Sequence, residues 1–214
     1  MKQYLNSIRQ PSAVTTTQKV AYSVIILLVG IALGIVSKAL DETSSNLLPA
    51  FLEMIDLRNF FSRMGVWLFC GICISIFSSS PLRAALNSFL FFMGMVGSYY
   101  VYTIVFAGFY PKSYMLIWIA MTVLSPFISA ICWYARGTHI VSLCISAILL
   151  MFMARQAFAF GFWCFDIRYT LELFLWGATI GVLYRTPMQI IVVTGTGMLL
   201  FFFTSPLNLF FGML

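Results

Sequence analysis

Long apolar runs separated by short polar segments dominate the chain from residue 20 onward. The first run, VAYSVIILLVGIALGIV, has seventeen residues, just enough for a helix to cross a hydrocarbon core of about 30 Å. Apolar residues are continuous within the runs and do not alternate with period two, so the pattern predicts helices and not a barrel. Seven spans are expected, at about 20–37, 58–78, 85–107, 113–135, 139–155, 169–185 and 188–205.

The composition requires a bilayer as the solvent of this chain. Of its 214 residues, 62% are hydrophobic and 8% are charged, whereas about 25% are charged in an ordinary soluble protein. A soluble domain cannot cover so much apolar side chain. We therefore expect an all-α integral membrane protein, with residues 1–214 forming a single polytopic domain.

One polar segment, residues 37–63, interrupts the apolar pattern after the first span. It holds Asp41, Glu42, Glu53 and Asp56, which are four of the six acidic residues in the chain. We expect it to form a structured extracytoplasmic loop that acts as a lid, with Asp56 capping the helix of the second span. A second outer segment, residues 155–172, is rich in aromatic rings and is expected to rest among the lipid headgroups.

The basic residues give a topology for the bundle. Lys2, Arg9 and Lys19 precede the first span without any acid, and each short loop on the same side carries one base. Counting lysine and arginine alone gives six on each side, so the orientation depends on the basic N-terminus. These features favour a cytoplasmic N-terminus in the plasma membrane.

A weak internal repeat relates the second and sixth spans. The first of these follows Asp56-Leu57-Arg58 and contains Trp67 and Gly71, and the other follows Asp166-Ile167-Arg168 and contains Trp176 and Gly177. The interval from glycine to the next proline, Pro81 or Pro187, is ten residues in both. The spans then form a parallel 3+1+3 pseudo-repeat, an architecture that resembles the sugar and vitamin facilitators of the SWEET and PnuC type, although their Pro-Gln and tryptophan-pair motifs are missing.

The near absence of charge within the spans limits the function classes. Only Glu172 and His139 fall near predicted span ends, so the sequence argues against a proton pump, a voltage sensor or a cation pathway built on buried carboxylates. A neutral solute between the helices would use hydroxyl and amide groups for recognition. The candidates for such groups are Asn87, Tyr99, Tyr102, Thr103, Thr122, Gln189 and Thr194.

Catalytic and cofactor signatures are missing from the sequence. Cys70 and Cys73 share one helix face, but a zinc site needs further ligands and the only histidine is His139. We expect no metal, no cofactor and no catalytic residue, and regard an enzyme as the less favoured class. The bases are scattered singly, which argues against a nucleic-acid partner.

The outer segments therefore hold the candidate ligand-binding site. Its residues are Asp41, Glu53, Asp56, Arg58, Arg63, Tyr99, Tyr102, Trp163, Asp166 and Arg168. The leading hypothesis is a protein that binds or transports a small neutral or zwitterionic solute under the lid 37–63. The alternatives are a membrane enzyme that acts on lipid or peptide through the outer carboxylates, and a non-catalytic subunit of a membrane complex or a homo-oligomer.

Overall fold

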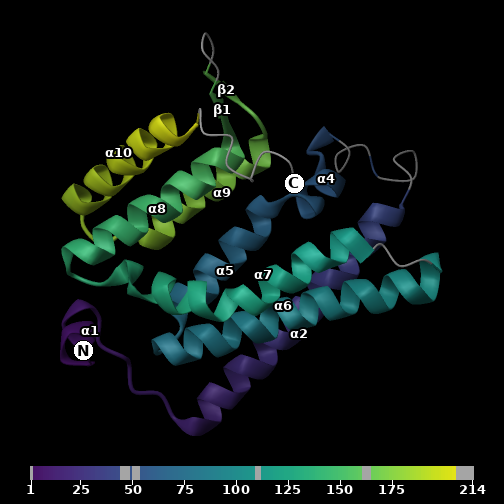
Figure 1. Ribbon diagram of the computed structural model, residues 1–214, viewed down its shortest axis with the longest axis horizontal. Helices are drawn as coiled ribbons and strands as arrows, with labels where there is room; N and C mark the ends of the chain where they lie inside the picture. Colours follow the sequence, from purple (N-terminus) through teal and green to yellow (C-terminus); the bar gives the residue numbers. More distant parts are fainter. Residues whose placement is uncertain (1, 44–48, 50–53, 109–111, 161–164, 206–214) are drawn as a thin grey trace.

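The computed structural model describes residues 2–43, 49, 54–108, 112–160 and 165–205, which form helices and one short β-hairpin (Figure 1). The α-helices are α1 (Lys2–Ile8), α2 (Thr16–Glu42), α4 (Leu57–Ser62), α5 (Met64–Phe77), α6 (Pro81–Tyr102), α7 (Lys112–Cys132), α8 (Ile140–Ala157), α9 (Thr170–Leu183) and α10 (Pro187–Thr204). A π-helical turn, η2 (Thr103–Ala107), continues α6, and a 3₁₀ turn, η3 (Trp133–Arg136), continues α7. Strands β1 (Phe158–Phe160) and β2 (Phe165–Ile167) pair antiparallel.

Five of the described helices are long and apolar enough to cross a membrane, which confirms the all-α membrane class. They cover Thr16–Glu42, Pro81–Phe106, Lys112–Arg136, Ile140–Ala157 and Pro187–Thr204. The helices in the other two expected spans, α5 and α9, have only 14 residues each. The second expected span, 58–78, is divided at Arg63 between α4 and α5. The total of seven spans stays a prediction.

Local capping explains where several helices begin. The hydroxyl of Thr15 and the side chain of Gln18 form a reciprocal capping box at the start of α2. Ser80 and Thr186 accept hydrogen bonds from the backbone N–H of Arg83 and Gln189, respectively, and a proline follows each of them at the first helical position. The α5–α6 and α9–α10 turns are therefore built in the same way.

Glycines allow the close packing of two helix pairs. A Cβ on Gly30 or Gly34 of α2 would overlap backbone carbonyls of α6, those of Phe91 and Met95. In the second pair, a Cβ on Gly197 of α10 would lie 3.0 Å from the carbonyl oxygen of Ala147 in α8. The α2–α6 contact follows the GxxxG pattern of Gly30 and Gly34, which lets helix backbones approach.

The helices end at two opposite faces of the bundle (Figure 1). The α1 face carries α1, the α5–α6 turn, η3 and the α9–α10 turn, and the hairpin face carries α4, β1 and β2. Helix α5 lies in the middle and contacts α6 and α7 on one side and α8 and α9 on the other. Both ends of α5 are therefore places where the two groups of helices are joined.

Candidate functional site

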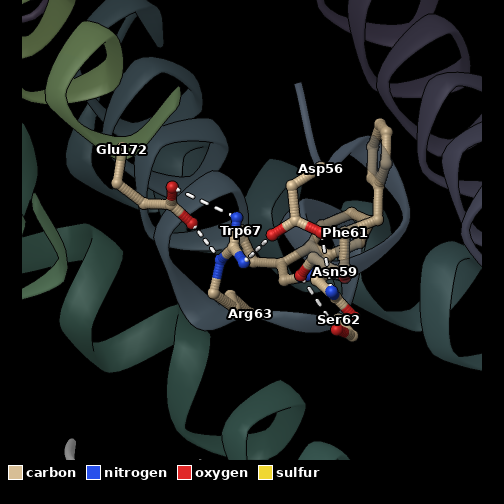
Figure 2. Close-up of polar contacts among 7 residues, drawn as sticks. All are labelled: Asp56, Asn59, Phe61, Ser62, Arg63, Trp67 and Glu172. Atoms are coloured by element: carbon tan, nitrogen blue, oxygen red, sulfur yellow. Dashed lines mark hydrogen bonds and ion pairs between the residues drawn. The ribbon is translucent and has the colours of Figure 1, made fainter. Parts of the chain in front are cut away.

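Arg63 lies at the break between α4 and α5 and binds two carboxylates at the hairpin face (Figure 2). Its Nε and Nη2 donate to the two carboxylate oxygens of Glu172, the second at 3.3 Å. Its Nη1 donates to Oδ2 of Asp56 at 2.8 Å, and its guanidinium carbon lies 3.9 Å from the ring centroid of Tyr169. We call Asp56, Arg63, Tyr169 and Glu172 the Arg63 clamp.

The clamp joins the two outer segments of the sequence. Asp56 and Arg63 belong to residues 37–63, whereas Tyr169 and Glu172 belong to residues 155–172. Such bidentate, charge-assisted bonds are the strong class of side-chain hydrogen bonds. The clamp therefore fastens the first outer segment to the start of α9.

Glu172 is the most deeply placed acid among the described residues, with an exposed fraction of 0%. It lies in the first turn of α9, where the partial positive charge of the helix N-terminus stabilises a carboxylate. Gly65, in the first turn of α5, makes room for it, because a Cβ there would lie only 3.0 Å from Cγ of Glu172. The absence of a side chain at Gly65 thus lets α5 and α9 meet around the ion pair.

The electrostatic environment keeps Arg63 charged. Burial acts to lower the pKa of its guanidinium, but the hydrogen bonds that it donates to Asp56 and Glu172, together with their charges, outweigh burial and raise the pKa above its ordinary value. The basic partner of the ion pair, Arg63, consequently stays charged across the whole physiological pH range.

Asp56 occupies the N-cap position of α4, where the sequence predicts a cap, but its side chain does not cap the helix. Asp56 has a left-handed backbone, with φ 54°, and its side chain makes no capping hydrogen bond to α4. Instead its Oδ1 accepts from Nδ2 of Asn59 at 2.6 Å while its Oδ2 accepts from Arg63. Aspartate tolerates this conformation better than most residues, so its carboxylate is turned towards Arg63.

The other described residues expected in the site do not bind Arg63. Asp41 accepts a hydrogen bond from the hydroxyl of Tyr99 at 2.7 Å, and Tyr102 packs against Phe106 in η2. Asp166 and Arg168 are exposed in and after β2, and Arg58 is half-buried in α4. Glu53 and Trp163 lie outside the described residues. The structure thus brings together Asp56 and Arg63 from the expected set and adds Tyr169 and Glu172 to them.

A cavity of about 290 Å³ begins next to the clamp, between α5, α7 and α8, with one contribution from α6. Met64, which directly follows Arg63, lines it together with Trp67 and Trp118. Its polar lining consists mainly of hydroxyls, those of Ser75, Ser125 and Ser129, and the rest is apolar. The wall is therefore suited to an uncharged and largely apolar molecule.

None of the hydrogen-bonding residues expected from the sequence lines this cavity. Thr122 donates to the carbonyl of Trp118 within α7, and Thr103 donates to the carbonyl of Tyr99. Asn87 accepts from Ser23 at 2.7 Å, which links α6 to α2. The described hydrogen bonds of these three residues thus lie within or between helices. The serines that line the cavity could not be distinguished in the sequence from other small residues.

The clamp and the cavity offer little to a metal ion. Among the residues that the structure describes, no group of three or more histidine, cysteine, aspartate or glutamate side chains is placed to hold one. The two carboxylates of the clamp already accept hydrogen bonds from the same guanidinium.

Comparison with known proteins gives one match. Residues 13–151, which are 139 of the 214 residues, match the model of a family of unknown function. No curated protein and no solved structure matches the chain. The matched range includes Asp56, Arg63 and the entire lining of the cavity except Phe152 and Met153, whereas Tyr169 and Glu172 follow it.

Proposed function

The chain belongs to the family of unknown function DUF6518, and from this starting point we propose that it binds and moves a small neutral solute across the membrane. The observation that carries the proposal is the cavity of about 290 Å³ between α5, α7 and α8. This volume is near the lower end of the range of small-molecule sites, about 300 to 1,000 Å³.

The lining narrows the solute class to molecules that are uncharged and largely apolar. Ser75 donates to the carbonyl of Gly71 and Ser125 to that of Thr122, but each hydroxyl oxygen still has lone pairs that accept hydrogen bonds. A zwitterion would need charged partners inside the cavity, but no charged residue lines it, and the charged groups of the Arg63 clamp bind one another. The lining therefore favours a neutral over a zwitterionic solute.

The outer segments act as the lid of the cavity in this proposal. Residues 37–63 and 155–172 meet at Arg63, immediately before Met64 enters the cavity wall. Separation of Arg63 from Glu172 would release α5 from α9 at the hairpin face. The clamp is thus the bond that must break for a solute to enter from that side.

The 3+1+3 pseudo-repeat fits this role. Helices α5 and α9 both have 14 residues, and each is followed by a three-residue turn and a proline-initiated helix, α6 or α10. We propose that α2, α5 and α6 form one repeat, α8, α9 and α10 the other, and α7 the connector. Short helices at corresponding positions of two repeats are typical of transporters whose solute site lies where the repeats meet.

The charge distribution supports a cytoplasmic α1 face. Arg9, Lys19, Arg83, Arg136 and Arg185 lie at this face, and the five described acids lie at the other. Positively charged loops remain on the cytoplasmic side during insertion. We propose this orientation in the plasma membrane, with residues 37–63 outside the cell.

The two alternative functions differ in their support. A membrane enzyme would need a carboxylate available for proton transfer, but Asp56 and Glu172 share the guanidinium of Arg63. A role as a subunit or a homo-oligomer is supported by a groove of about 590 Å³ along α2 and α6, lined by Gly94, Gly97 and Ser98. Small residues of this kind let a further helix approach.

An uptake assay in liposomes tests the proposed transport. The purified full chain is reconstituted and challenged with uncharged solutes of different size, such as glucose, uridine, riboflavin and indole. At least one solute is expected to enter faster than into empty liposomes. Folded wild-type protein that moves none of the solutes would contradict the proposed transport. If solutes bind to the protein but none crosses the membrane, the function would be restricted to binding.

A matched pair of substitutions connects the flux to the cavity. Gly71 lines the cavity, and a Cβ on it would lie 3.5 Å from the ring of Phe92, so Gly71→Leu fills the cavity without a backbone overlap. Gly97 lines the α2–α6 groove, and a Cβ there meets nothing within 4 Å. Gly71→Leu should abolish the flux, whereas Gly97→Leu should leave it unchanged.

A further inference from the structure

Three arginines from distant parts of the chain converge on the turn that follows α7. Arg9 donates to the carbonyl of Trp133, and its guanidinium carbon lies 4.2 Å from the ring centroid of that tryptophan. Arg185 donates to the carbonyl of Gly137, and Arg136 lies in η3 between these two acceptors. We call Arg9, Arg136 and Arg185 the arginine cluster.

No acidic residue accompanies the arginine cluster at the α1 face. The sequence contains no aspartate or glutamate before residue 41, between residues 57 and 165, or after residue 172. All the segments that form the α1 face fall within these ranges. Among the described residues, no aspartate or glutamate therefore neutralises the cluster, in contrast to Arg63 at the other end of α5.

The arginines repel one another at this site. Burial, and after it the charges of Arg136 and Arg185, together lower the pKa of Arg9 to about 10. A guanidinium in a protein nevertheless keeps its proton at neutral pH. Loss of a proton therefore does not relieve the repulsion among the three guanidinium groups at neutral pH.

The described bonds to carbonyls at helix ends use only some of the N–H donors of the arginine cluster. Arg9 also donates to the carbonyl of Ile76 at 2.8 Å, so it links the C-terminal ends of α5 and α7. A guanidinium has five N–H donors, and the described bonds of Arg9 and Arg185 to backbone carbonyls use two and one of them. Arg136 lies over the ring of Phe77 at 5.8 Å.

We propose that the arginine cluster binds a phosphate group, supplied either by the headgroup of an anionic membrane lipid or by free phosphate. Planar guanidinium forks match phosphate oxygens, and basic pockets at the ends of membrane helices bind such headgroups. The N-terminus of α8, which starts at Ile140 directly after this turn, adds its positive partial charge. This site does not depend on the proposed transport.

A binding titration on the purified full chain in an uncharged detergent tests the site. The probes are dioctanoylphosphatidylglycerol, dioctanoylphosphatidylcholine and inorganic phosphate, and binding is followed by tryptophan fluorescence, to which Trp133 contributes beside Arg9. Arg136→Gln and Arg185→Gln are each expected to weaken phosphatidylglycerol binding about tenfold. Arg9 is left in place because it holds two helix ends together.

Two controls separate specific binding from general attraction. Lys112→Gln removes one exposed positive charge at the start of α7, on the opposite face, and should leave the affinity unchanged. The double variant Arg136→Lys, Arg185→Lys keeps the charge but loses the guanidinium forks, so it should bind phosphatidylglycerol more weakly than the wild type and more tightly than the glutamine variants. The variants are compared by their affinity at the same concentration of folded protein. A variant that is expressed poorly is therefore not mistaken for one that binds weakly.

The probes also distinguish the two sources of phosphate. Arginine-dependent binding of phosphatidylglycerol without binding of inorganic phosphate identifies a lipid headgroup, and equal arginine-dependent binding of both identifies free phosphate. The proposal is overturned if the glutamine variants bind every probe as tightly as the wild type. It is equally overturned if phosphatidylcholine and phosphatidylglycerol bind alike in all variants.

Discussion

Arg63 and Glu172 are 109 positions apart in the sequence, yet the guanidinium of one donates two hydrogen bonds to the carboxylate of the other. The exposed fractions of their side chains are 14% and 0%. In a charge pair so far removed from water, the attraction between the two groups has to offset the free energy of desolvating them, and either partner is costly to bury alone. Four predictions on the packing and electrostatics of the bundle follow.

Removal of one partner of this pair should destabilise the protein strongly. Arg63→Met leaves the buried carboxylate of Glu172 without a cation and should lower the free energy of unfolding by about 3 kcal/mol or more. The double variant Arg63→Met, Glu172→Gln should recover much of this loss, because neither charge then remains buried. Thermal unfolding followed by tryptophan fluorescence measures both, and Arg168→Met, at an exposed position, serves as the control. A double variant no more stable than Arg63→Met would contradict the explanation.

The contribution of the clamp to stability should be independent of pH in the alkaline range, because the pKa of Arg63 is raised. A base whose pKa is raised by folding contributes stability that is complete below its pKa in the unfolded chain and is lost only as the pH rises above that value. The difference in unfolding temperature between the wild type and Arg63→Met should therefore stay constant from about pH 7 to about pH 11. A difference that shrinks within this interval would show that Arg63 loses its proton earlier.

Two glycines of α5 should respond oppositely to alanine. In Gly65→Ala the new Cβ would lie 3.0 Å from Cγ of Glu172, so the ion pair must shift, and a loss of about 1 to 3 kcal/mol is expected. In Gly71→Ala the nearest atoms, those of the Phe92 ring, are 3.5 Å away, and the stability should be unchanged or higher. Denaturation of the two variants in the same detergent gives the comparison, and equal stabilities would exclude steric contact with Glu172 as the cause.

The α2–α6 contact should be intolerant of a single methyl group. A Cβ on Gly34 would overlap the carbonyl of Met95 and the hydroxyl of Ser98, so Gly34→Ala must push the two helices apart. We expect a loss of about 1 to 3 kcal/mol in unfolding free energy. Gly97→Ala, on the open side of α6, should change it by less than about 0.5 kcal/mol.

The sequence predicts the helices better than it predicts their contacts. Unbroken apolar runs locate a helix in each expected span, because a bilayer admits few other backbone structures. The GxxxG pair of Gly30 and Gly34 also indicates the close approach of another helix, and α6 is that helix. The strands β1 and β2 have only three residues each, too few for an alternating pattern to be recognised.

The candidate site depends on tertiary contacts that no local pattern contains. Asp56 and Arg63 stand out as charged residues beside an apolar run, but their partner Glu172 looks like an ordinary acid near a span end. Its position inside the apolar pattern was a signal, since a buried acid needs a cation. Which nearby arginine provides the cation for Glu172 depends on how α5 and α9 pack.

The length of α9 has a consequence for the lipids around the protein. Its 14 residues are about 21 Å long, some 9 Å less than a typical hydrocarbon core. Helix α5 is equally short but is surrounded by other helices, whereas α9 exposes Phe174 at 69% and Gly177 at its surface. In the predicted seven-span topology, the acyl chains beside α9 have to compress, so the bilayer is expected to be locally thinner there.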